Sequence, residues 1–214
     1  CEYKFADEIK SFTEKPVKER AVVYADLESA INVIGEHINI LCGWVERSEN
    51  KVYIKTSIAP LFDYLKKLPQ DEVLVYFHNG EGYDFHFIMQ ELAKIPSMDP
   101  KKFDIIADSS EKIRYFTINI GGKKKLIFKD TFAFVSQSLS SWLESTKKTN
   151  CSFSRFSNAF PNRLQREFVL QKNPFPYNAI QKPEDLQREI TALDLWFTAE
   201  NRVELFCDKY TEEE

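Results

Sequence analysis

Short runs of apolar residues, many of them alternating with polar ones, dominate the first two thirds of the chain. Such runs predict strands, because alternate side chains of a strand face the core. They lie at residues 21–29, 37–46, 51–57, 71–79, 103–109 and 114–130. The four residues RSEN separate the second run from the third, and Gly121-Gly122 interrupts the last run, so each of these breaks predicts a hairpin turn. The run at 71–79 ends at Asn-Gly and predicts a buried strand.

Apolar residues recur at helical spacing elsewhere, at residues 57–68, 83–94, 138–146 and 184–210. Serines are available to cap the third of these helices, and the last follows Pro183 and has acids in its first turn. The proline-containing stretch 150–183 predicts irregular structure. Residues 1–20 read as a polar entry arm and residues 21–210 as one domain. The order of elements predicts an α/β fold, a mixed sheet with flanking helices.

Composition narrows the class of protein. The chain has 214 residues, of which 43% are apolar and 29% charged, as in a soluble globular domain that buries a core. The net charge of −4 excludes a histone-like binder that relies on bulk positive charge, but it allows a nucleic-acid enzyme with a local basic groove.

Apolar runs, cysteine spacing and the chain ends bear on where the protein resides in the cell and on whether the chain is complete. No apolar run approaches the ~18 residues of a membrane span, and the first residues have no signal-peptide core. The four cysteines are too far apart for a CxxC zinc site, so we expect reduced thiols in an intracellular protein. The missing initiator methionine and the TEEE ending suggest a piece of a longer chain.

Acidic residues on the first predicted strand offer candidate chemistry. Asp26 and Glu28 are two residues apart, so their side chains share one face of the strand. Two neighbouring carboxylates repel each other, and burial makes the repulsion more costly. A divalent cation removes this cost, and hard oxygen ligands suit Mg²⁺ or Mn²⁺. The alternative is that both acids form a solvated strand end.

Two further acids can complete this site. Asp84 follows a second apolar strand and begins a predicted helix, where it can also act as a helix cap. Asp194 lies in the last predicted helix beside Trp196 and Phe197, although it can simply face water. Together the acids can converge at one edge of a sheet. Four carboxylates around two metal ions about 3.5–4 Å apart is an arrangement that hydrolyses phosphodiesters in line.

Several segments resemble the exonuclease motifs of family B DNA polymerases. VVYADLES (22–29) resembles the first motif, Asp-x-Glu. VYFHNGEGYDFHFIMQEL (75–92) is similar to the second motif of the protein-primed branch, which has phage, linear-plasmid and Polinton-type members; there an Asn precedes the metal-binding Asp by four or five residues. LIFKDTFAFVSQSLSSW (126–142) resembles a segment of that branch that contacts single strands, and NPFPYNAI (173–180) its FPY segment. The chain thus resembles the N-terminal 3′–5′ exonuclease domain of such a polymerase, without its palm motifs.

The resemblance implies a fold and an activity. The fold would be ribonuclease H-like, that of the DEDD exonucleases, and the reaction would be two-metal hydrolysis of single-stranded DNA 3′ ends. The carboxylates holding two Mg²⁺ or Mn²⁺ ions would be Asp26, Glu28, Asp84 and Asp194. The residues contacting DNA would be Asn79, Phe85 and Thr131. For Asn79 the alternative is a turn former before Gly80.

The resemblance also implies partners. These are a primer terminus and template strand, the polymerase domain of the same parent chain, and a terminal protein. The compartment stays open between nucleus, mitochondrion and a viral or plasmid replication site. His78 and His86 flank the second motif without a zinc ligand set, so we expect packed or hydrogen-bonded histidines.

One position departs from the family pattern. The third motif, Tyr-x-x-x-Asp, places the family Asp at Asp194 and its Tyr at Ile190. Residues four apart share a helix face, so a Tyr there would reach the attacking water, which Ile cannot hydrogen-bond. Three hypotheses therefore stay open: an editing exonuclease, a degenerate module that guides DNA without cutting, and a ribonuclease H-like nuclease unrelated to replication.

Overall fold

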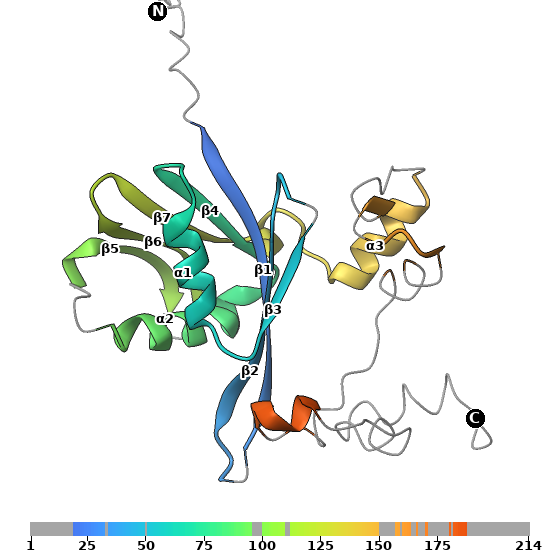
Figure 1. Cartoon of the computed structure of the whole chain (residues 1–214), viewed down its shortest axis with the longest axis horizontal. Helices are drawn as coiled ribbons and strands as arrows, with labels where there is room; N and C mark the ends of the chain where they lie inside the picture. The colour runs from blue at the N-terminus through green and yellow to red at the C-terminus, as the bar shows by residue number, and fades with distance from the viewer. Residues whose placement is uncertain are drawn as a thin grey trace, which may run out of the picture.

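The fold is a mixed seven-stranded sheet with helices on it (Figure 1). The computed structural model describes residues 19–32, 34–49, 51–95, 100–109, 112–149, 157–158, 160–163, 166, 170, 180 and 182–187. The strands are β1 Arg20–Ile31, β2 His37–Glu46, β3 Val52–Lys55, β4 Glu72–Phe77, β5 Phe103–Ser109, β6 Lys112–Gly121 and β7 Lys124–Asp130. Their order in the sheet is β3-β2-β1-β4-β7-β6-β5. β4 is parallel to its neighbours β1 and β7, and the other pairs are antiparallel.

Three of the four predicted helices are confirmed as α-helices. The α-helices are α1 Ala59–Lys67, α2 Asp84–Ala93 and α3 Leu139–Lys147. Short 3-10 helices lie at η1 Gly80–Gly82, η2 Pro100–Lys102, η3 Thr131–Ala133 and η4 Pro183–Gln187. The predicted α/β class, with a mixed sheet and flanking helices, is confirmed. Both predicted hairpins, β2–β3 and β6–β7, are confirmed as antiparallel pairs.

The last predicted helix is only partly described. Its first residues form η4, which is a 3-10 helix rather than an α-helix. Asp194 and Ile190 lie outside the described residues, as do residues 1–18 of the predicted entry arm. Among the helices that the structure does describe, none combines the length and the apolar character needed to cross a membrane.

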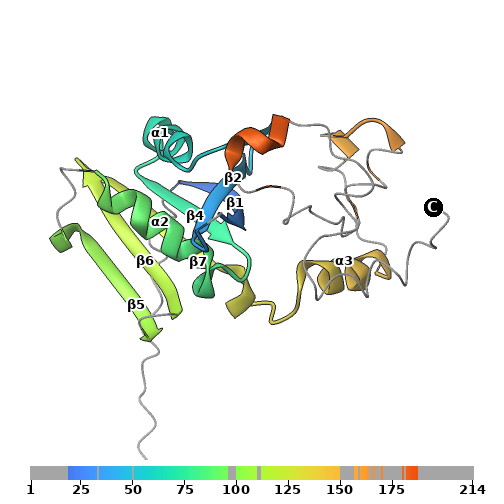
Figure 2. The ribbon, with the colours of Figure 1, turned by 90° about the horizontal axis from the view of Figure 1, so that it is seen from below.

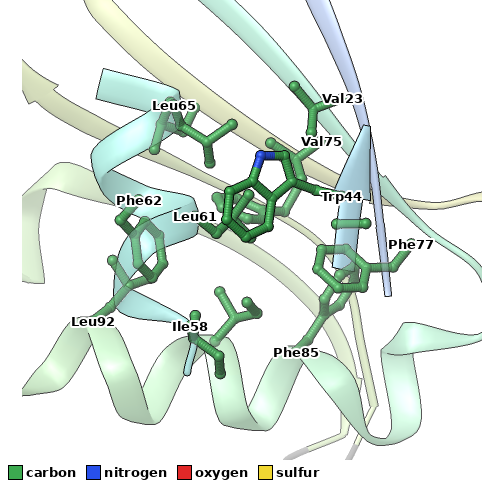
Figure 3. Close-up of a cluster of buried hydrophobic side chains, with 14 of the residues drawn as sticks. Val23, Trp44, Ile58, Leu61, Phe62, Leu65, Val75, Phe77, Phe85 and Leu92 are labelled. Atoms are coloured by element: carbon green, nitrogen blue, oxygen red, sulfur yellow. The ribbon is translucent and has the colours of Figure 1, made fainter. Parts of the chain in front are cut away.

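The main core lies between one face of the sheet and the helices α1 and α2. Alternate residues of β1 supply it from Ala21 to Leu27, and β4 and β7 add their own alternate residues. The helices contribute apolar side chains that point toward the sheet (Figure 3). At the centre, the rings of Phe116 and Phe128 stack with centroids 4.5 Å apart, and Phe85 of α2 meets Phe116 edge to face at 5.2 Å. This contact fixes the beginning of α2 on the sheet.

The strand β1 is longer than its parallel neighbour. It pairs with β4 only as far as Tyr24 opposite Tyr76, but it pairs with β2 until Ile31, with a register shift at Glu28. β1 and β2 therefore extend together beyond the rest of the sheet (Figure 1). The strand predicted at 21–29 extends further than expected, because the ladder with β2 carries it past Asp26 and Glu28 to Ile31.

Candidate active site

Acidic residues from two elements meet at the carboxyl end of β4. The β1–β4 pairing stops at Tyr24, so Asp26 lies level with the residues that follow β4. Those residues form η1 and lead directly into α2, whose first residue is Asp84. The Asp84 Oδ1 accepts the backbone N–H of Leu27 at 3.2 Å, between Asp26 and Glu28 in sequence. In α/β sheets, ligands bind at this position beyond the carboxyl ends of strands.

The electrostatics of these acids show an excess of negative charge. Burial, together with the charges of Asp84 and Glu28, raises the pKa of Asp26 to about 7, even though part of its side chain stays open to solvent. Burial also raises the pKa of Asp84 to about 6; backbone N–H groups oppose this rise, and the charges of Asp130 and Glu28 add to it. The neighbouring Cys42 thiol has a pKa of about 12, because of burial and the charges of Asp26 and Asp84. A bound cation would relieve this repulsion.

The donor atoms suit a hard divalent ion, but the part of the chain that the structure describes does not form a complete cage. No group of three His, Cys, Asp or Glu side chains among the described residues is placed to hold a metal. The predicted fourth ligand, Asp194, lies outside those residues. Asp26, Glu28 and Asp84 thus supply carboxylate oxygens beyond the carboxyl end of β4. The number of metal ions that they would hold stays a prediction.

The repulsion predicts how stability depends on pH. A carboxyl whose pKa is raised by folding favours the folded state at low pH, and this contribution is lost as pH rises from ~3.9 through about 7. We expect Asp26→Asn to raise the melting temperature at pH 8 in EDTA by about 2–4 °C, which is about 1 kcal/mol after allowance for solvent screening. Near pH 5 the difference should be small. Thermal unfolding followed by circular dichroism measures both values.

A surface acid provides the matched control for this measurement. Asp63→Asn on the exposed side of α1 should leave the melting temperature within about 1 °C at either pH. A lower melting temperature for Asp26→Asn than for the wild type at pH 8 would contradict the repulsive charge pair.

The turn between β4 and α2 has an unusual backbone. Asn79 adopts a left-handed conformation with φ 62°, which Asn tolerates better than most residues, and its side chain is exposed. Gly80 is buried, and a Cβ there would lie 2.8 Å from the Cβ of Phe77. The alternative interpretation, in which Asn79 forms a turn before Gly80, is confirmed. Its side chain is exposed, so a strand of DNA could contact it, and that role stays a prediction.

The structure corrects the expectation for Phe85. This side chain is fully buried, with its ring edge to face against Phe77 at 5.5 Å and against Phe116. It therefore anchors α2 and offers no ring face to a base. Position alone could not reveal this, because the residue after a helix-initial acid can point either into the core or away from it.

Thr131 belongs to a hydrogen-bond network with His78. The Nε2–H of His78 donates to the carbonyl of Gln137 at 2.9 Å, and its Nδ1 lies 2.8 Å from the Thr131 hydroxyl oxygen. The Thr131 hydroxyl itself donates to the carbonyl of Phe77 at 3.0 Å. The prediction of a hydrogen-bonded His78 is confirmed, whereas Thr131 already has partners within the protein. Its contact with DNA stays a prediction.

Sequence reasoning missed Asp130, the last residue of β7. Its side chain is 2% exposed and accepts backbone N–H groups of the turn that holds Asn79. The available signal was an acid directly after a buried strand, in the KDT segment beside Thr131.

An exposed apolar surface continues from this network along η3 and α3. Phe134, Leu139 and Trp142 are 71%, 52% and 41% exposed, and no side chain of α3 is buried. The Trp142 ring stacks near His78, with centroids 6.4 Å apart. Figure 1 and Figure 2 both place α3 to one side of the sheet rather than on it. This surface therefore begins at His78, the residue before Asn79, and continues along α3 beside the sheet.

Comparison with known proteins gives a family. The model of DNA polymerase type B, organellar and viral, matches residues 65–205, which is more than half of the chain. The matched segment contains Asn79, Asp84 and Thr131, while Asp26 and Glu28 precede it. A search of curated proteins found no similar sequence. The mixed sheet with flanking helices is consistent with a ribonuclease H-like exonuclease fold. On the extent of this match, the chain belongs to the organellar and viral family of type B DNA polymerases.

Proposed function

We propose that this chain is the 3′–5′ proofreading exonuclease domain of a type B, protein-primed DNA polymerase. The observation that carries the proposal is the meeting of Asp26, Glu28 and Asp84 beyond the carboxyl end of β4, where burial and mutual repulsion raise the pKa of two of them. Structural carboxylates normally avoid such mutual repulsion, so its presence in a family of DNA enzymes favours a catalytic site.

The residues that would hold the ions are Asp26, Glu28, Asp84 and Asp194, with Mg²⁺ or Mn²⁺ as the metal. Two such ions supply the Lewis acidity that activates water and offsets charge on the leaving 3′ oxygen. The chain's own contribution is to fix the carboxylates before substrate binds. Asp84 is held by the Leu27 N–H and by the buried Phe85 beside it, so its carboxylate is set against β1.

Single-stranded DNA is the proposed substrate. The exposed Asn79 and the apolar surface of Phe134, Leu139 and Trp142 offer side chains that a single strand entering the site could contact. Aromatic side chains bind unpaired bases without sequence preference, because every base has a π-face. An editing site needs this tolerance. The polymerase domain of the parent chain and a terminal protein are the proposed protein partners.

The function can be tested directly with the 214-residue chain. A 5′-labelled single-stranded oligonucleotide with Mg²⁺ or Mn²⁺ should be shortened stepwise from its 3′ end. We expect Asp26→Ala to abolish the ladder, a loss of roughly 10³-fold or more, because a carboxylate that would hold the catalytic cations is removed. Asp63→Ala on α1 is the matched control and should retain the ladder. A ladder of equal intensity in Asp26→Ala would refute the assignment.

A second candidate is a module that guides DNA without cutting it. The feature that favours it is Ile190, which stands where the third motif of the resembling family has a Tyr and cannot hydrogen-bond a water molecule. The expected result in that case is retained binding of the oligonucleotide with no shortening in either metal. Introducing Ile190→Tyr would then separate a site lacking only this hydroxyl, which should gain activity, from a module with no catalytic capacity.

A further inference from the structure

The carboxylate of Asp130 organises the turn that carries the proposed DNA contact. Asp130 ends β7 and pairs with Phe77, the last residue of β4, so its side chain lies level with the turn that follows β4. It is 2% exposed and uses both oxygens. Oδ1 accepts the N–H of Asn79 at 2.8 Å, and Oδ2 accepts the N–H of Glu81 at 2.9 Å.

A third hydrogen bond joins this carboxylate to the segment after β7, the other segment predicted to contact DNA. Oδ1 also accepts the N–H of Phe132 at 2.7 Å, which caps η3. The turn after β4 and the segment after β7 are about fifty residues apart in sequence, and Asp130 binds both of them. Hydrogen bonds to an ionised carboxylate are among the stronger ones in proteins.

We propose that Asp130 is a positioning residue that sets how single-stranded DNA is held, acting through Asn79 and not through contact with DNA. This inference rests on the proposed function and deepens it. The left-handed backbone of Asn79 is a sparsely populated conformation, and it persists only where surrounding bonds hold it. The Asp130 bonds on either side of Gly80 supply that restraint and direct the Asn79 side chain outward.

The chemistry of the bonds distinguishes a carboxylate from an amide of the same size. Asparagine at this position has one accepting oxygen, and its NH₂ group would face a backbone N–H. If the oxygen keeps Asn79 and Phe132, the Glu81 N–H loses its acceptor and the turn shifts. Asp84 has its own anchors in the Leu27 N–H and in Phe85, so the acids should stay in place.

These considerations define the expected kinetics of Asp130→Asn in the whole chain. We expect the KM for a single-stranded oligonucleotide to rise about 10-fold with kcat changed less than about 3-fold. Hydrolysis of the p-nitrophenyl ester of thymidine monophosphate, which needs the acids but no strand contact, should be unchanged. A purely structural role would instead lower both activities together with the folded fraction.

A control and a binding measurement make the test independent of cleavage. Asp104→Asn is the matched control, because Asp104 also accepts a hydrogen bond, from Thr117 at 3.1 Å, but lies on the edge strand β5. Fluorescence anisotropy in Ca²⁺ should show about 10-fold weaker oligonucleotide binding for Asp130→Asn and unchanged binding for Asp104→Asn. Amide hydrogen exchange at Glu81 should be at least about 10-fold faster in Asp130→Asn.

The outcomes separate this inference from the function on which it rests. A wild-type chain that binds the oligonucleotide but never shortens it overturns the exonuclease and retains the role of Asp130. A wild-type chain that cleaves, with Asp130→Asn equal to it in KM and binding, overturns only the role of Asp130. A wild-type chain that neither binds nor cleaves overturns both.

Discussion

Asp84→Asn is expected to reduce the rate of 3′ nucleotide removal by roughly 10³-fold while the fold stays intact. The amide has the same shape and can still accept the Leu27 N–H, but it carries no charge for a divalent ion. Because Asp84 is buried beside other acids that raise its pKa, losing its charge should not weaken the folded state. Single-turnover rates on an oligonucleotide, with saturating Mn²⁺, measure the effect.

Two comparisons make this result specific to the site. Circular dichroism should give Asp84→Asn a melting temperature equal to or above that of the wild type at pH 8. Asp63→Asn, an exposed acid on α1, should keep the full rate. If Asp84→Asn kept more than a tenth of the wild-type rate, Asp84 would be only an acid in the first turn of α2, favoured there by the helix dipole.

Phe116→Ala should have the largest effect on stability, a loss of about 3–5 kcal/mol in the free energy of unfolding. Its ring is fully buried, stacks on Phe128 at 4.5 Å and receives the edge of Phe85. Removing it leaves a cavity beneath the first turn of α2, which the surrounding rigid rings cannot fill. Urea denaturation followed by fluorescence measures the change.

The adjacent residue offers a matched control. Tyr115 lies on the opposite face of β6 and is only half-buried, so Tyr115→Ala should cost clearly less. Equal losses for the two variants would show that Phe116 is not at the centre of the core.

Much of the fold was predictable because the spacing of apolar residues indicates which side chains are buried. The residues of β1 from Ala21 to Leu27 alternate between core and open face, and the spacing in 83–94 predicted α2 to within a residue at each end. Serine before α3 was expected to cap it, and Ser138 does so by accepting the Ser141 N–H. Strand alternation, helix bounds and helix caps depend on residues that are close in sequence, so the local sequence pattern predicts them.

What sequence could not supply depends on which strands become neighbours. The role of Asp130 exists only because β7 lies beside β4, so that a side chain from one strand reaches the turn after the other. The inward orientation of Phe85 depends on where Phe116 lies across the core. The continuation of β1 through its acids depends on β2, whose pairing no local signal in residues 21–29 specifies.

The early end of β4 changes how the connection to α2 should respond to insertions and deletions. Loops usually accept an added residue with little loss of stability, because they are solvated and make few packing contacts. Here the segment from Phe77 to Asp84 must have the length that brings Asp84 to the Leu27 N–H. That N–H lies on β1 beyond the point where its pairing with β4 ends. Within the same span Asn79 and Glu81 must meet the oxygens of Asp130. The length of this connection is therefore fixed. Inserting or deleting one residue would displace Asn79, Glu81 and Asp84 from their hydrogen-bond partners together.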